Sequence, residues 1–129
     1  MASYLLDTVA FLWIVQGSSK LPERVAATLV TDGALCHLSH VSLIEMAIKH
    51  RNGKMPLPAP PHEIIATECP LRGIELLPLT PEAIFLLETL PQHHNDPFDR
   101  LLACQAATHD MTLVTPDRIL RKYKIKTLW

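Results

Sequence analysis

The order of strand-like and helical segments is the feature that most restricts the fold of this chain. Short apolar runs alternate along the sequence with longer segments of helical periodicity. Such alternation is typical of a parallel sheet whose two faces are covered by helices. We therefore predict a three-layer α/β fold with a mainly parallel five-stranded sheet flanked by helices.

The expected elements can be placed on the sequence, apart from their exact boundaries. Strand character is found in SYLL at 3–6, LCHL at 35–38, IELLPL at 74–79, TLVT at 112–115 and KTLW at 126–129. Helical periodicity fits residues 8–16, 22–31, 43–52, 62–69, 81–89, 97–109 and 116–122. The Pro-rich stretch at 55–63 favours an extended loop within the domain.

Length, composition and charge narrow the class of protein. With 129 residues, of which 48% are hydrophobic, the chain is expected to form one globular domain over 1–129. No apolar run is long enough to span a bilayer and no basic segment precedes the apolar N-terminal stretch, so we predict a cytoplasmic protein. The three cysteines are odd in number and lack a C-x-x-C pair, as is typical of a reducing compartment.

The net charge of -1 provides no global field for a nucleic acid, so such a partner would have to be held locally. Two basic stretches of the sequence could provide such local contacts. Our candidates for phosphate contacts are Lys49, Arg51 and Lys54 in the first stretch and Arg121 and Lys122 in the second. Taken alone, each stretch is better explained as a solvated helix face.

Four acidic residues follow predicted strands or begin predicted helices: Asp7, Glu45, Asp99 and Asp117. Each also has a purely structural explanation, because acids and hydroxyls cap helix N-termini. Ser42 with Glu45 has the spacing of a capping box, Asp96 precedes a proline at the first helical position, and Thr115 precedes Pro116 in the same way.

Together, however, the acids predict a shared site. The helices that follow parallel strands all begin at one edge of the sheet, so the four carboxylates should converge there. Converging carboxylates repel one another unless a cation compensates them, and a hard divalent ion with oxygen ligands, Mg²⁺ or Mn²⁺, is the natural one. Such an ion supports phosphodiester hydrolysis by an ion-bound water.

The segments that carry these acids resemble the PIN domain family and, within it, the VapC-type toxins of bacterial toxin–antitoxin pairs. The resembling segments cover almost the whole chain, and the stretch at 90–106 is the most specific of them. They are YLLDT at 4–8, SLIEMAIK at 42–49, LPQHHNDPFDRLLACQA at 90–106, LVTPD at 113–117 and the ending IKTLW.

The resemblance implies a role for each site residue. Asp7, Glu45, Asp99 and Asp117 would form the acidic quartet that holds Mg²⁺ or Mn²⁺. Asp96 would be an accessory acid or only a helix cap, and we favour the cap. Thr115 would position a water or act as a cap. Arg100 is expected to contact a phosphate or to pair with a neighbouring acid.

The resemblance also implies that the chain is an endoribonuclease toxin that acts on RNA, forms a homodimer and is blocked by a cognate antitoxin. An apolar groove near the first helices would be the mark of that antitoxin. A zinc site at His93 and His94 is disfavoured, because no second pair at ligand spacing accompanies them.

Two other functions remain open at this point. One is phosphoryl transfer through an aspartyl-phosphate, which would expect a second acid two residues after the strand-end Asp7, where Val9 stands. The other is a non-catalytic PIN-like module that binds RNA or protein. Its sign would be loss of acids from the quartet, and all four are present.

Overall fold

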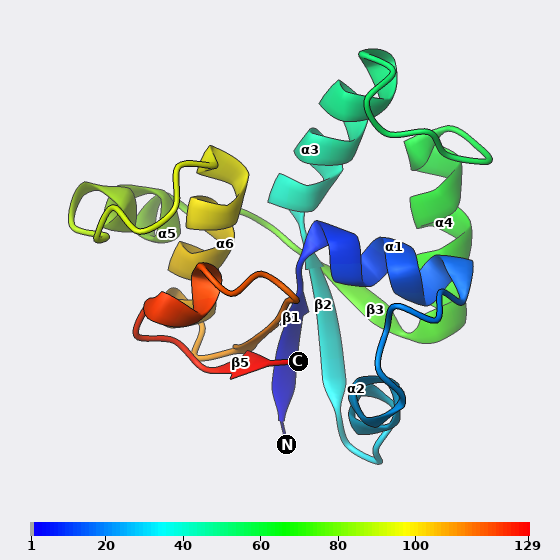
Figure 1. Ribbon diagram of the computed structural model, residues 1–129, viewed down its shortest axis with the longest axis horizontal. Helices are drawn as coiled ribbons and strands as arrows, with labels where there is room; N and C mark the ends of the chain where they lie inside the picture. The colour runs from blue at the N-terminus through cyan, green and yellow to red at the C-terminus, as the bar shows by residue number, and fades with distance from the viewer. Residues whose placement is uncertain (1) are drawn as a thin grey trace.

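The computed structural model describes residues 2–129, whose strands form one sheet of five parallel members between layers of helices (Figure 1). The strands are β1 (Ser3–Leu6), β2 (Leu35–Ser39), β3 (Ile74–Leu77), β4 (Thr112–Val114) and β5 (Thr127–Leu128). The α-helices are α1 (Thr8–Gln16), α2 (Glu23–Leu29), α3 (His40–Arg51), α4 (Pro61–Arg72), α5 (Pro81–Phe85) and α6 (Pro97–Thr108). Two 3-10 helices are η1 (Leu86–Glu88) and η2 (Leu120–Lys122). The predicted α/β class with its parallel five-stranded sheet is confirmed.

The strand order β3-β2-β1-β4-β5 places β1 in the middle of the sheet. From β1 the chain moves outward through β2 and β3, then returns to the other side of β1 for β4 and β5. The direction of winding therefore reverses between β1 and β4. In open α/β sheets such a switch point leaves a crevice at the carboxyl ends of the strands, and the residues that follow β1 and β4 flank it.

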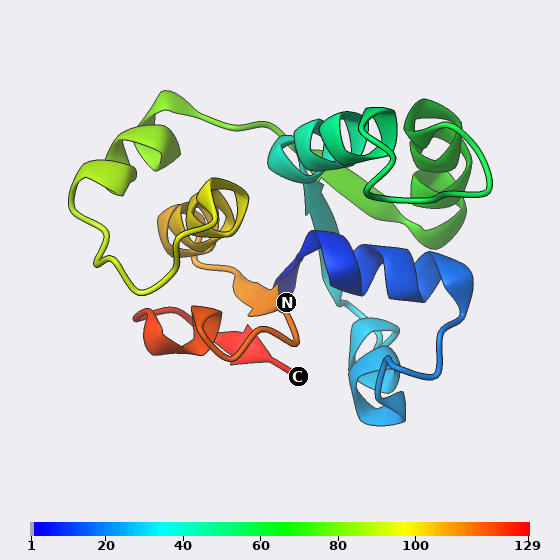
Figure 2. The ribbon, with the colours of Figure 1, turned by 45° about the horizontal axis from the view of Figure 1, so that its top comes forward.

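Helices cover both faces of the sheet, so the central strand is apolar on both sides. Leu6 packs with Phe11, Val25 and Ile64 from α1, α2 and α4, whereas its neighbour Leu5 packs with residues of α6 on the opposite face. Figure 2 shows α1, α2 and α4 on one side of the strands and α5 and α6 on the other. Because both faces are covered, β1 is a continuous hydrophobic run rather than an alternating one.

The predicted helix over 116–122 is wrong. Only η2 forms there. The Asp117 carboxylate accepts from the Ile119 N–H at 2.8 Å, a group that the predicted helix would have bonded to the Thr115 carbonyl, and the Thr115 hydroxyl accepts from the Asp117 N–H at 3.0 Å. Such local bonds compete with helix formation and favour turns.

Other boundaries shift for identifiable reasons. The strand predicted over 74–79 ends at Leu77, because Pro78 has no N–H for the sheet. The helix predicted over 81–89 divides into α5 and η1. The helix α4 continues past its predicted end at 69 to Arg72 and ends at Gly73, whose φ of 66° favours glycine.

Within residues 2–129, no helix combines the length and the apolar character needed to cross a membrane. The three cysteines are free thiols; Cys69 and Cys104 are buried, whereas Cys36 is half-buried. Burial raises the pKa of the thiol at each of the three positions. All three therefore stay largely protonated near neutral pH.

Candidate active site

A cleft of about 320 Å³ lies at the carboxyl edge of the sheet, at the switch point between β1 and β4. Its lining is predominantly acidic and comes from four separate parts of the chain. The lining residues are Asp7, Thr8, Val9, Glu45, Lys49, Asp96, Asp99, Pro116 and Asp117. All four acids of the predicted quartet therefore border one cavity, although they are as far as 110 positions apart in sequence.

Asp7 leaves β1 and caps α1, where its carboxylate accepts from the Ala10 N–H at 2.7 Å. The residue is only 4% exposed. Burial raises the pKa of Asp7 to about 6, although hydrogen bonds from Thr115 and Ala10 act against the rise, and the charges of Glu45 and Asp117 add to it. The structural explanation is thus correct for Asp7, but the cap alone leaves a costly buried charge.

Glu45 is not part of a capping box, so this prediction for Ser42 and Glu45 is wrong. The helix α3 begins at His40, earlier than predicted, and its cap is Ser39, whose hydroxyl accepts from the Val41 N–H at 2.9 Å. Glu45 therefore lies in the second turn of α3, where it is 7% exposed and faces the cleft.

Glu45 is held by hydroxyl and ammonium groups. Thr8 Oγ1 lies 2.6 Å from Glu45 Oε1 and 2.9 Å from Ser42 Oγ. Because an ionised carboxylate only accepts, the Thr8 proton goes to Glu45 and Ser42 donates to Thr8. Lys49, one turn along α3, donates to Glu45 Oε2, and this bond raises the pKa of Lys49.

The other half of the cleft contains Asp99 in the first turn of α6 and Asp117 in the turn after β4. His94 bridges them, with its Nε2 atom 2.7 Å from Asp117 Oδ2 and 3.2 Å from Asp99 Oδ2. Burial, together with the charge of Asp96, raises the pKa of Asp99 to about 7. Burial also raises the pKa of Asp117, but hydrogen bonds from His94 and the Ile119 N–H outweigh it and leave that pKa below its usual value.

The cap that we favoured for Asp96 is confirmed, since its carboxylate accepts from the Phe98 and Asp99 N–H groups at 2.8 and 3.4 Å. Of the two roles expected of Arg100, the pairing with a neighbouring acid is not found among the described residues, and the contact with a phosphate stays a prediction. Its guanidinium donates to the carbonyls of Leu90, Pro91 and His94. Among residues 2–129 it makes no ion pair with an acid, so its observed contacts tie down the loop before α6.

Of the remaining candidates, Thr115 and Lys49 lie at the cleft, and the other basic residues lie outside it. The buried Thr115 hydroxyl contacts the backbone of Asp117, so it supports the turn that carries this acid. Lys49 lines the cleft, whereas Arg51 and Lys54 are exposed at the far end of α3. Arg121 and Lys122 are exposed on η2, which follows Asp117.

The donor set of the cleft fits a hard divalent cation. Four carboxylates supply oxygen ligands of the kind that Mg²⁺ and Mn²⁺ prefer. Asp7 and Asp99 have raised pKa values partly because the other acids repel their charge. Donor atoms of Asp99 and Asp117 lie within 4.8 Å of one another, close enough to share one ion.

Three contacts within the site were missed in the sequence. The Thr8 hydroxyl contacts Glu45, Lys49 pairs with Glu45, and His94 contacts two acids. The expected contact of Lys49 with RNA stays a prediction. The available signal was the i,i+4 spacing of Glu45 and Lys49, which places them on one helix face. For His94 the only signal was its place within the same short segment as Asp96 and Asp99.

Comparisons with known proteins identify the family and the fold. The model of the PIN domain family matches residues 4–126. Among curated proteins none matches the sequence. Several solved structures share the fold at low sequence identity, and three illustrate the range.

The first is VapBC2 from Rickettsia felis bound to a promoter DNA fragment, with 17% identity, a TM-score of 0.73 and coverage of 98% of each chain. The second is DNA-bound VapBC from Salmonella typhimurium, with 19% identity, a TM-score of 0.67 and coverage of 99% of this chain and 98% of that one. The third is FitAcB from Neisseria gonorrhoeae, with 18% identity, a TM-score of 0.66 and coverage of 98% and 96%. At these identities the solved structures establish the fold, and the family model establishes membership: this chain belongs to the PIN domain family.

Proposed function

We propose that this chain is a divalent-metal-dependent endoribonuclease whose acidic quartet is Asp7, Glu45, Asp99 and Asp117. The observation that carries the proposal is the convergence of these four acids on one cleft at the switch point of the sheet. Two of them have pKa values raised towards neutrality, the state expected of carboxylates arranged for a cation.

The chain's own residues would divide the work between two sides of the cleft. On one side, Asp7 is held as the cap of α1, and Glu45 is held by Thr8 and Lys49. On the other side, α6 carries Asp99, the turn after β4 carries Asp117, and His94 contacts both. When bound, Mg²⁺ or Mn²⁺ would neutralise charge on the scissile phosphate and lower the pKa of the attacking water. Lys49 lies in the cleft, where its ammonium group can also meet a phosphate.

The test is cleavage of a mixed RNA pool by the purified chain with Mg²⁺, Mn²⁺ or chelator. We expect metal-dependent cleavage that Asp7→Asn and Asp99→Asn each reduce by at least about 10²-fold, since even the partners of metal ligands are worth 10- to 100-fold. The matched control Asp32→Asn replaces an exposed acid outside the cleft and should cleave normally. RNA binding that persists in chelator, without cleavage in either metal, would instead support a non-catalytic module.

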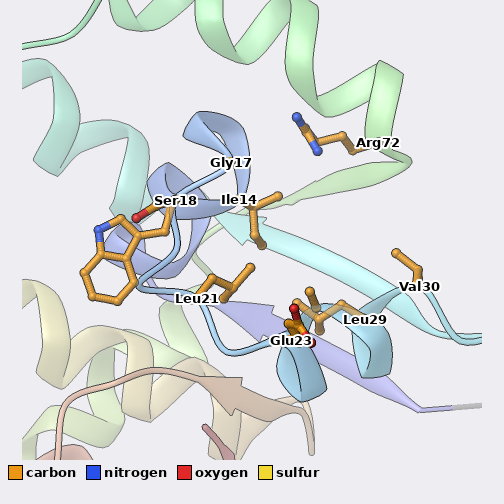
Figure 3. A pocket seen from close by; sticks show the side chains of 10 residues that line it. Ile14, Gly17, Ser18, Leu21, Glu23, Leu29, Val30 and Arg72 are labelled. Carbon is orange, nitrogen blue, oxygen red and sulfur yellow. The ribbon is translucent and has the colours of Figure 1, made fainter.

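We further propose that the chain is the toxin of a toxin–antitoxin pair. The solved VapBC structures are of toxin–antitoxin type, and this chain has an apolar groove of about 340 Å³ between α1, α2 and the end of α4 (Figure 3). Ile14, Leu21 and Leu29 point into it, with Glu23 and Arg72 at its border. An apolar segment of an antitoxin is the occupant that such a groove fits.

The homodimer stays a prediction. Ile44 and Ile48 lie one turn apart on α3 and are 48% and 46% exposed, which provides an apolar stripe for a second copy. Sizing of the purified chain at micromolar concentration should give a dimer. A monomer in that experiment would contradict the expectation.

A further inference from the structure

His94 is the best-connected side chain at the site that the proposed quartet leaves without a role. Its ring is 13% exposed and lies between Asp99 and Asp117. The 2.7 Å distance from Nε2 to Asp117 Oδ2 is a short hydrogen bond, and the 3.2 Å distance to Asp99 Oδ2 is a longer second contact. One ring nitrogen thus serves two of the four acids.

The tautomer of the His94 ring follows from the hydrogen bond at its other nitrogen, Nδ1. The backbone N–H of Asp96 donates to His94 Nδ1 at 3.0 Å. A nitrogen that accepts a hydrogen bond carries no proton, so the proton of the neutral ring lies on Nε2 and points at the two carboxylates. In this arrangement Nε2 has no lone pair for a metal ion, and His94 acts on the site through Asp117 and Asp99.

The backbone of His94 is fixed by a second layer of contacts. Its N–H donates to the hydroxyl of Tyr123 at 2.9 Å, and Tyr123 is only 5% exposed. Arg100 Nη1 lies 3.5 Å from the His94 carbonyl and 3.4 Å from the Tyr123 hydroxyl. The backbone that carries the ring is therefore held at both its N–H and its carbonyl, which is the arrangement of a residue that orients others.

Asp117 shows the effect of this support. Its Oδ1 atom accepts from the Ile119 N–H at 2.8 Å, while Oδ2 accepts from His94, so both carboxylate oxygens have a donor and the group cannot rotate freely. Removal of His94 would leave Oδ2 and the Asp99 carboxylate without this donor.

We propose that His94 is a positioning residue: its Nε2–H orients the carboxylates of Asp117 and Asp99 for the divalent cation of the acidic quartet. This inference rests on the proposed function only in taking these acids as ligands. It assigns to His94 neither direct metal ligation nor contact with the reacting phosphate.

The experiment compares His94→Ala, His94→Asn and His94→Gln with wild type and with the control His62→Ala, a histidine on α4 outside the cleft. Gln has a reach similar to that of the imidazole Nε2 and keeps an N–H donor, whereas Asn is too short. Three quantities are measured: Mn²⁺ affinity by calorimetry without RNA, kcat and KM for RNA cleavage in Mn²⁺, and Tm in chelator.

We expect His94→Ala and His94→Asn to weaken Mn²⁺ binding about 10- to 100-fold, the range known for residues that support metal ligands. Cleavage at a fixed Mn²⁺ concentration should fall through kcat rather than KM, and His94→Gln should restore most of both losses. Should His94→Ala or His94→Asn fail to fold in chelator, the other one still gives, beside His94→Gln, the comparison between a donor that reaches the acids and a side chain that does not. Should His94→Gln fail, wild type takes its place in that comparison.

Mn²⁺ affinity of folded His94→Ala or His94→Asn equal to that of wild type would overturn the proposal, as would equal losses in His94→Gln and His94→Ala. A wild type that binds no Mn²⁺ would overturn it as well. A wild type that binds Mn²⁺ but cuts no RNA would overturn the proposed function alone, because the affinity comparison does not use RNA.

Discussion

The acidic cleft and the apolar groove are two hollows of opposite chemical character. Both are built on α1: Asp7 at its N-terminus borders the cleft, and Ile14 and Gly17 at its other end border the groove. With nine residues, α1 separates the two by about 14 Å. The cleft gathers carboxylates, for which we propose a cation, whereas the groove exposes apolar surface, for which we propose a segment of an antitoxin.

This difference teaches that metal and inhibitor need not compete for the same atoms. A substitution in the groove should lower the affinity for the antitoxin and leave RNA cleavage unchanged. A substitution in the cleft should lower RNA cleavage and leave the affinity for the antitoxin unchanged. Four predictions test how far that separation holds, from the largest expected effect to the smallest.

The largest effect is expected in the groove. Val30 borders it and is 83% exposed, so Val30→Glu should fold normally but place a charge against an apolar partner. We expect affinity for the cognate antitoxin to fall about 10- to 100-fold, the range of one important interface side chain, with cleavage unchanged. Inhibition of cleavage by titrated antitoxin measures this.

The control is Leu71→Glu, which places the same charge at another highly exposed apolar residue, 74% exposed, outside the groove lining. It should keep full affinity. Equal inhibition of wild type and Val30→Glu would show that the groove is not the docking surface and would break the comparison.

In the cleft, metal affinity should depend on pH. The pKa of Asp7 is raised to about 6 and that of Asp99 to about 7, and each must lose its proton before it binds a cation. Mn²⁺ affinity should therefore rise at least about tenfold from pH 6 to pH 8 and level off above that. Calorimetry across this range checks it, and a flat profile would contradict raised pKa values in these acids.

RNA binding should depend on charges outside both surfaces. Arg121 and Lys122 on η2 are exposed and free of ion pairs within the described residues, so Arg121→Gln with Lys122→Gln should weaken RNA binding about 3- to 10-fold at low salt. The slope of log affinity against log salt should fall by roughly 1–2. Unchanged affinity at every salt concentration would show that these two residues do not contact the RNA.

The smallest effect concerns stability without metal. Because the folded-state pKa of Asp99 is raised, its ionisation disfavours folding; the penalty is absent below the unfolded pKa and complete above pH 7. In chelator at pH 8, Asp99→Asn should therefore raise Tm by about 2–5 °C. Thermal unfolding with Asp32→Asn as control measures this, and a lower Tm would show that the carboxylate stabilises the empty cleft.

Features of the fold that depend on interactions between residues close in sequence were predicted correctly more often than features that depend on distant contacts. The five strands and most helices were predictable, because apolar periodicity and caps such as Asp96 before Pro97 act over a few residues. Their parallel arrangement and the convergence of the four acids followed from the general geometry of α/β sheets.

Local competition was harder to predict. The start of α3 at His40 depends on the choice of Ser39 rather than Ser42 as cap, and both hydroxyls occur in suitable contexts. Ser39 also bonds to the buried Gln105 of α6, a partner 66 positions away. The turn at 115–119 shows the same limit, because Thr115 and Asp117 favoured a turn over the helix that periodicity predicted.

The sequence by itself therefore determined the α/β class, the acids at the strand ends and the family resemblance, because these depend on short-range patterning. Only the tertiary structure decided the strand order around β1, the groove between α1, α2 and α4, and the place of His94 between Asp99 and Asp117. Those features depend on which distant segments pack together. A hydrogen bond across the fold leaves no periodic trace in the sequence.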